Sequence, residues 1–197
     1  MAHRGEIYWY DPDPRAILPL DNFHVSRSLQ RAMKRVQIEQ ADGSIEYFVP
    51  AEVRKSDKAE FLITVNRDFP AVITACASPH RQGTWIDEQV LEGYVNLHYA
   101  GFAHSVETWL DGELVGGLYG VSLNGLFAGE SMFSRATDAS KVALVYLVER
   151  MRQQGLVLLD VQFQTNHLSQ FGVIEIPRWQ YKRRLAQALK VECRFVQ

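Results

Sequence analysis

The amino-acid sequence predicts a mixed α/β (α+β) protein in which helices flank one sheet. Three observations lead to this fold class: strand-like segments joined by tight-turn dipeptides in mid-chain, amphipathic segments on both sides of them, and a short apolar strand around residue 160. The 197 residues are 47% hydrophobic and 22% charged, as in an ordinary globular protein. With 13 Gly and 7 Pro, the composition is not that of a low-complexity chain.

Charge and composition exclude several classes of protein. The 21 Lys and Arg are balanced by 23 Asp and Glu, which excludes a protein that coats nucleic acid non-specifically. Binding of nucleic acid by a local basic patch remains possible for this charge balance. Apolar runs fall far short of the roughly 20 residues that span a bilayer, and no apolar signal core follows the first residues. Cys76 and Cys193 offer neither a disulfide framework nor metal-ligand spacing. We therefore expect a cytoplasmic monomer that uses no metal, no cofactor and no membrane.

The N-terminal part begins with an extended segment and continues with a basic helix. Pro12 and Pro14 forbid a regular helix within residues 8–21, which are rich in aromatic side chains. Apolar spacings near 3.6 then predict a helix over 26–35. A solvated face and a phosphate-binding face both explain its second stripe, which consists of Arg27, Arg31, Lys34 and Arg35.

The next stretch is polar before it becomes regular again. Residues 37–60 are charged and weakly periodic, with a turn at Asp42-Gly43, and are typical of a hairpin or loop excursion. A short strand is expected over 61–65. Helices are expected over 69–78 and 87–99.

The middle of the chain predicts an antiparallel meander. Strands are expected over 104–110, 114–121 and 126–133. They are separated by Asp111-Gly112 and Asn124-Gly125, dipeptides that favour tight hairpin turns.

A helix, a buried strand and a last helix complete the predicted fold. The first helix is capped near Asp138 and ends at Gly155, and the strand covers 156–163. Pro177 opens the last helix, whose Tyr181 faces inward. This order matches the core of the acetyltransferase-like fold, a mixed sheet used by many acyl and aminoacyl transferases, although a fold alone does not give a function.

Two carboxylates are the candidates for chemistry. Asp160 shares a strand face with Gln162, about 7 Å away, and a carboxylate on a buried strand must be paired or hydrogen-bonded. A structural capping role for this pair is equally open. Glu130 lies among apolar neighbours and needs a cation or hydrogen-bond donors. The amino group of a ligand would serve, and so would Arg135 or Lys141.

Other sites are not indicated. His104 and His167 are typical of packing histidines, and no Ser or Cys lies in a nucleophile elbow. Gly116-Gly117 and Gly120 lie inside the meander and do not open a helix, so they predict no phosphate loop.

A series of motifs, in order along the chain, resembles the leucyl/phenylalanyl-tRNA–protein transferase family. The motifs are Trp9 with 11–18 (DPDPRAIL), 24–28 (HVSRS), 83–86 (GTWI), 103–107 (AHSVE), 114–120 (LVGGLYG), Phe127 with 129–134 (GESMFS), 139–141 (ASK), 159–162 (LDVQ) and His167. The resemblance implies an aminoacyltransferase that moves Leu or Phe from aminoacyl-tRNA to the α-amino group of proteins beginning with Arg or Lys. Such proteins are thereby marked for degradation by the N-degron pathway.

The resemblance also implies roles for particular residues. Asp160 and Gln162 would orient and deprotonate the incoming amine, without a metal. Glu130 would hold the aminoacyl-adenosine end, and Trp85 would pack on it. The wall of the apolar side-chain pocket would consist of Leu118, Phe127, Leu144 and Leu159. Because strict alternation puts Phe127 and Glu130 on opposite faces, as it does Leu159 and Asp160, a bulge or a splayed strand is required.

The resemblance further divides the chain and gives the basic residues a role. Residues 1–65 would be a shortened N-terminal segment with a polar insertion (about 37–60), and 66–197 an acetyltransferase-like catalytic domain. The basic stripe of the first helix would contact tRNA phosphates, together with the cluster Lys182, Arg183 and Arg184.

Two alternatives remain at this point. One is another acyltransferase of the same fold, acetylating a small amine from coenzyme A, although no Gly-rich pyrophosphate loop is evident at 134–139. The other is a non-catalytic paralogue that binds aminoacyl-tRNA or N-terminal-Arg peptides.

Overall fold

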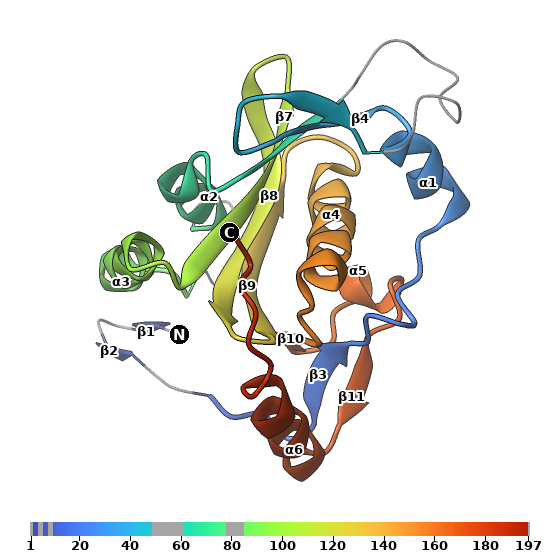
Figure 1. Cartoon of the computed structure of the whole chain (residues 1–197). Coiled ribbons are helices and arrows are strands. Elements are labelled where there is room, and N and C mark those ends of the chain that lie inside the picture. The colour runs from blue at the N-terminus through green and yellow to red at the C-terminus, as the bar shows by residue number, and fades with distance from the viewer. Residues whose placement is uncertain (1, 4–5, 8–9, 49–60, 78–84, 197) are drawn as a thin grey trace.

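The computed structural model describes residues 2–3, 6–7, 10–48, 61–77 and 85–196 (Figure 1). Trp9, Gly83 and Thr84 of the family motifs, and the part of the polar insertion beyond residue 48, lie outside these ranges. The described strands form a nine-stranded sheet in the order β11-β3-β10-β9-β8-β7-β6-β4-β5, and a separate pair β1 (Ala2–His3) and β2 (Glu6–Ile7). The strands of the large sheet are β3 (Arg15–Leu18), β4 (Val36–Glu39), β5 (Ile45–Tyr47), β6 (Phe61–Val65), β7 (Ala103–Leu110), β8 (Glu113–Leu123), β9 (Leu126–Ser134), β10 (Leu158–Gln162) and β11 (Ile174–Ile176).

The predicted meander and crossover are confirmed. β7, β8 and β9 are antiparallel neighbours, and Asp111 and Asn124 take the left-handed backbone conformation that tight hairpin turns need. β10 then joins β9 in parallel, after the helix α4 (Ala139–Gln154) has crossed over the sheet. The sheet is therefore mixed, as the fold class predicts.

Helices cover both faces of the sheet. The core on one face joins α4 to side chains of β7, β8 and β9, with α1 (Arg27–Met33) packed on its edge through Leu29 and Met33. The core on the other face joins α2 (Phe69–Cys76) and α3 (Glu88–Tyr99) to the same strands. Figure 1 shows α2 and α3 on the side of the meander opposite α4. Two neighbours on β8, Leu118 and Tyr119, enter the two different cores because successive strand residues alternate.

Several local predictions differ from the structure. The Asp138 position does begin α4, but its side chain makes no capping bond and instead pairs with Lys141. A short helix α5 (Asn166–Ser169) and the strand β11 were not expected. The last helix, α6 (Arg178–Ala188), follows Pro177 as predicted and buries Tyr181.

Strands of the N-terminal part belong to the same nine-stranded sheet. β4 and β5 form the predicted hairpin, β6 pairs with β7, and β3 lies between β10 and β11. The division of the chain at residue 65 stays a prediction, and the sheet continues across it. None of the described helices is long and apolar enough to cross a membrane.

Candidate active site

The site is built on a fork in the sheet. β9 and β10 pair over three positions, from Leu126 opposite Leu158 to Ala128 opposite Asp160. Beyond this point β9 follows β8 as far as Ser134, whereas β10 ends at Gln162. The two strands therefore diverge, and a cavity of about 1150 Å³ opens between them.

A backbone irregularity lies on each arm of the fork. On β9 the pairing with β8 shifts so that Glu130 is an extra residue between Gly129 and Ser131. On β10 the pairing with β3 shifts around Val161, and Gln162 takes a left-handed conformation with φ of 58°. Irregularities are thus present on both strands, and Glu130, Val161 and Gln162 line one cavity. They do not bring the predicted pairs together, because Phe127 and Asp160 do not line it.

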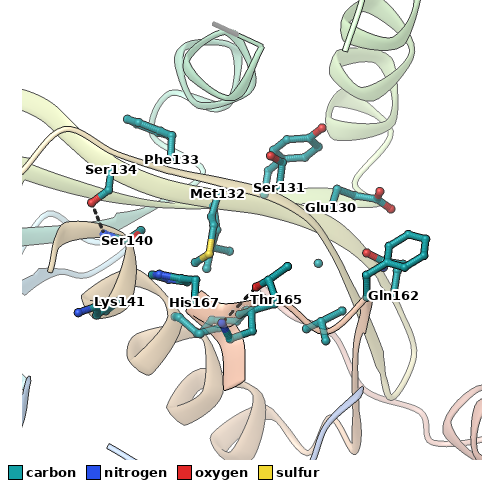
Figure 2. A pocket seen from close by; sticks show the side chains of 18 of the residues that line it. Glu130, Ser131, Met132, Phe133, Ser134, Ser140, Lys141, Gln162, Thr165 and His167 are labelled. Atoms are coloured by element: carbon teal, nitrogen blue, oxygen red, sulfur yellow. Dashed lines mark hydrogen bonds between the residues drawn. The ribbon is translucent and has the colours of Figure 1, made fainter. Parts of the chain in front are cut away.

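The lining of this one cavity comes from both faces of the sheet, and we divide it accordingly. We call the part beside α4 the apolar chamber; its apolar lining includes Leu118, Met132, Leu144, Leu147 and Leu159. We call the chamber beside α2 and α3 the aromatic chamber; its lining is Ala75, Trp85, Tyr94, Tyr119 and Phe133. Figure 2 shows Ser131 and Phe133 projecting to one side of β9 and Met132 to the other. The chambers meet where Glu130 and Gln162 line the cavity.

Glu130 is a half-buried carboxylate at this junction. Burial raises its pKa, the nearby charge of Asp160 raises it further, and a hydrogen bond from Tyr94 lowers it. The ring of Trp85 packs edge-to-face on that of Tyr94, with 6.4 Å between centroids. Neither of the two candidate cations binds this carboxylate, because Arg135 donates to the Leu114 carbonyl and Lys141 pairs with Asp138.

Asp160 lies behind the cavity wall and is fully hydrogen-bonded. Its side chain is 1% exposed and accepts two parallel bonds from Arg15, of 3.0 Å from Nε and 2.6 Å from Nη2. It also accepts a 2.7 Å bond from the Tyr181 hydroxyl and a 3.0 Å bond from the backbone N–H of Gln162. Asp160 therefore meets Gln162 through the main chain, while the Gln162 side chain lines the cavity.

The apolar wall differs in part from the prediction. Leu118, Leu144 and Leu159 line the cavity, but Phe127 is fully buried behind it, where its ring packs 5.0 Å from that of Phe195. Met132 and Leu147 complete the wall and were not identified from the sequence. Helical spacing could have found Leu147, since it lies three residues after Leu144 on the same face of α4.

The predicted tRNA-binding residues fall into two separate groups. On α1, Arg27 and Arg31 are exposed, and Lys34 and Arg35 just beyond it are half-buried. On α6, Lys182 pairs with Asp11 at 3.3 Å, Arg183 is exposed and Arg184 is half-buried. Figure 1 shows α1 and α6 far apart, so the two groups do not form one patch.

The forked sheet, with helices on both faces and a cavity at the fork, defines a mixed α/β protein. The family model of leucyl/phenylalanyl-tRNA protein transferase matches residues 17–186. A protein of that name from Herpetosiphon aurantiacus is 51% identical over 196 residues, covering 99% of this chain and 90% of the relative. Another from Gloeobacter violaceus is 48% identical over 189 residues, covering 96% and 85%. The chain belongs to the leucyl/phenylalanyl-tRNA–protein transferase family, which confirms the resemblance.

Two solved structures match more weakly. The structure of L-PGS from Bacillus licheniformis matches with a TM-score of 0.42 and 15% identity, covering 80% of this chain and 50% of that one. A conserved protein of unknown function from Staphylococcus epidermidis matches with a TM-score of 0.44 and 11% identity, covering 83% and 57%.

Proposed function

We propose that this protein transfers leucine or phenylalanine from its aminoacyl-tRNA to the α-amino group of a protein that begins with Arg or Lys. The observation that carries the proposal is the cavity, in which an apolar chamber and an aromatic chamber meet at Glu130 and Gln162. Family membership supports the reaction. The acceptor range, the marking of acceptors for degradation and a place in the cytoplasm as a monomer are parts of the proposal.

The two chambers suit the two halves of the donor. Burial of a leucine or phenylalanine side chain away from water is favourable, and the apolar chamber offers Leu and Met side chains for it to pack against. The terminal adenosine has an aromatic base, which would pack on Trp85 in the aromatic chamber. The ester that joins amino acid and ribose would then lie between them, at the fork.

Glu130 suits the amino group of the donor. A half-buried carboxylate beside a neutral phenol is stabilised by a cationic ligand, because the cavity screens charge less than water does. An ammonium group at the junction of the two chambers would be within its reach, and this would fix the ester carbonyl at the fork.

The reaction is an aminolysis. The acceptor amine attacks the ester carbonyl carbon, a C–N bond forms, the C–O bond to the ribose breaks, and a proton passes from the amine to the leaving oxygen. An ester is already activated, so holding the amine against the carbonyl supplies much of the rate enhancement. The side-chain oxygen of Gln162 would accept a hydrogen bond from the amine. This bond would direct the lone pair of the amine nitrogen toward the ester carbonyl carbon. An amide is a weak base, so its contribution is orientation.

The test is transfer of radiolabelled leucine from Leu-tRNA to a protein with N-terminal Arg. The same acceptor with an acetylated N-terminus is the matched control, and Phe-tRNA is tested in parallel. We expect transfer to the free N-terminus only, with a severe loss in the Gln162→Ala variant at unchanged melting temperature. Measurable tRNA binding without transfer from either donor would instead make the protein a non-catalytic binder.

A further inference from the structure

We propose that Arg15 and Tyr181 are positioning residues, which hold the Asp160 carboxylate as an anchor for Gln162 and so fix the Gln162 amide in the cavity. The inference rests on the proposed function and deepens it. It assigns to two residues outside the strand β10 a role in the transfer step, and to Asp160 a role different from that of a proton acceptor.

The first argument is that Asp160 has no acceptor position left for a substrate. An ionised carboxylate accepts about four hydrogen bonds in its plane. Both oxygens of Asp160 accept two: Oδ1 from Arg15 Nε and the Gln162 N–H, Oδ2 from Arg15 Nη2 and the Tyr181 hydroxyl. With a side chain only 1% exposed, Asp160 cannot meet the attacking amine, so it cannot remove the proton directly.

The second argument is the backbone of Gln162. A residue other than glycine pays a steric penalty in the left-handed region, and Gln162 has a φ of 58°. Its N–H donates to Asp160, which stabilises this conformation, and the shift in β10–β3 pairing falls at the same point. The conformation turns the Gln162 side chain into the cavity, across the fork from Glu130 (Figure 2).

The third argument is that the anchor is itself held from two directions. Arg15 comes from β3, which is paired antiparallel with β10, and Tyr181 comes from α6. The Arg15 guanidinium lies 4.6 Å from the centre of the Tyr181 ring, so the tyrosine supports the arginine with its ring and the aspartate with its hydroxyl. These contacts fix the orientation of the Asp160 carboxylate, and its hydrogen bond with the Gln162 N–H then fixes the backbone at Gln162.

The decisive variant is Tyr181→Phe, which keeps the ring beneath Arg15 and removes one hydrogen bond. We expect the kcat of leucine transfer to fall about tenfold, with the KM for Leu-tRNA little changed and the melting temperature lower by a few degrees at most, so that the variant is fully folded in the assay. In a Gln162→Ala background the same substitution is expected to change kcat by less than about twofold, because the residue through which Tyr181 acts is gone. Tyr99→Phe, at a tyrosine that is 76% exposed, is the control.

A tenfold loss that persists in the Gln162→Ala background would overturn the proposal, and so would an unchanged kcat in Tyr181→Phe. A spectroscopic measurement separates this proposal from the proposed function. The backbone amide resonance of Gln162 is expected to move in Tyr181→Phe and not in Tyr99→Phe. If the wild type transfers nothing, the proposed function fails while this resonance still decides whether the anchor exists; a stationary resonance would refute the anchor.

Discussion

The hydroxyl of Tyr94, on α3, lies beside the carboxylate of Glu130 at the bulge of β9 and lowers the pKa of that carboxylate. A phenol is a neutral neighbour, so it leaves the negative charge in place. Burial raises the pKa of the Tyr94 hydroxyl as well, so the tyrosine stays protonated and remains a donor. The pair thus presents an anion to the cavity.

The Glu130→Gln variant tests whether that anion holds the donor. Because burial raises the pKa of Glu130, the carboxylate takes up a proton at a higher pH than an exposed glutamate does. Below about pH 6 the α-amino group of the donor is already charged, so the affinity of the wild type for Leu-tRNA should weaken there as the pH falls and Glu130 takes up a proton. In Glu130→Gln we expect weaker binding that lacks this pH-dependent loss, whereas the exposed Glu113→Gln should behave as wild type. Identical pH profiles for wild type and Glu130→Gln would contradict the role.

The apolar chamber should set the choice between leucine and phenylalanine. Leu144 lines it and is 3% exposed, so Leu144→Phe takes space from the ligand. We expect kcat/KM for Leu-tRNA relative to Phe-tRNA to rise about tenfold, since a mismatch of methylene size is worth about 1–3 kcal/mol. Leu123→Phe, at an exposed leucine on the β8–β9 turn, should leave the ratio unchanged. An unmoved ratio in folded Leu144→Phe would mean that the donor side chain binds elsewhere.

The two basic groups make separable predictions about tRNA. Arg31→Glu on α1 and Arg183→Glu on α6 each reverse an exposed charge. For each phosphate that the variant no longer binds, the slope of log affinity against log salt should become shallower by about 1. Arg194→Glu, also exposed and outside both groups, is the control. A slope unchanged by one of the reversals would remove that group from the tRNA surface.

His104 should make stability depend on pH. It is 4% exposed beside the Phe195 ring, and burial lowers its pKa from 6.5 to about 4. Between these values the unfolded chain binds a proton that the folded protein excludes, so the free energy of unfolding decreases as the pH falls from 6.5 to 4. The melting temperature of His104→Gln should fall less steeply over this interval. The exposed His24→Gln is the control, and equal slopes for wild type and His104→Gln would refute the assignment.

Replacing Gly120 by a larger residue should lower the stability of the fold, because there is no room for a side chain. A Cβ there would overlap the carbonyl oxygen of Ala128 and the ring of Phe127, next to the bulge where β8 pairs with β9. Backbone cannot move aside as a flexible side chain can, so Gly120→Ala should lower stability by about 1–3 kcal/mol. Gly93→Ala on α3, where a Cβ meets nothing within 4 Å, should instead be neutral or stabilising. Calorimetry on the two variants checks the difference, and equal melting temperatures would contradict it.

The elements that the sequence predicts well are those with local causes. The turns at Asp111-Gly112 and Asn124-Gly125 define the meander, and Asp111, Gly112 and Asn124 take the left-handed backbone conformation there. β11 was missed because three residues form a strand only by pairing with β3, which is remote in sequence. Asp138 begins α4 without capping it, because Lys141 attracts its carboxylate instead.

The site shows the same division between local and remote causes. That Asp160 needs partners follows from its place on a buried strand, but that they are Arg15 and Tyr181 depends on how β3 and α6 pack against β10. The place of Phe127 depends on a remote contact as well. Leu159, paired opposite it, lines the cavity, whereas the Phe127 ring is buried 5.0 Å from that of Phe195, a contact with a segment remote in sequence.

The position of β3 between β10 and β11 has a consequence for synthesis of the chain. A ribosome releases Arg15 early, but the strand that must lie beside it arrives only with residues 158–162 and the one on its other side with residues 174–176. Until then Asp160, the carboxylate partner of Arg15, has not been synthesised, and β3 has no strand paired to either of its edges. A nascent chain that stops short of β10 can build the meander and α4, but it holds no site. The cavity can therefore assemble only after residues 158–176 have been synthesised.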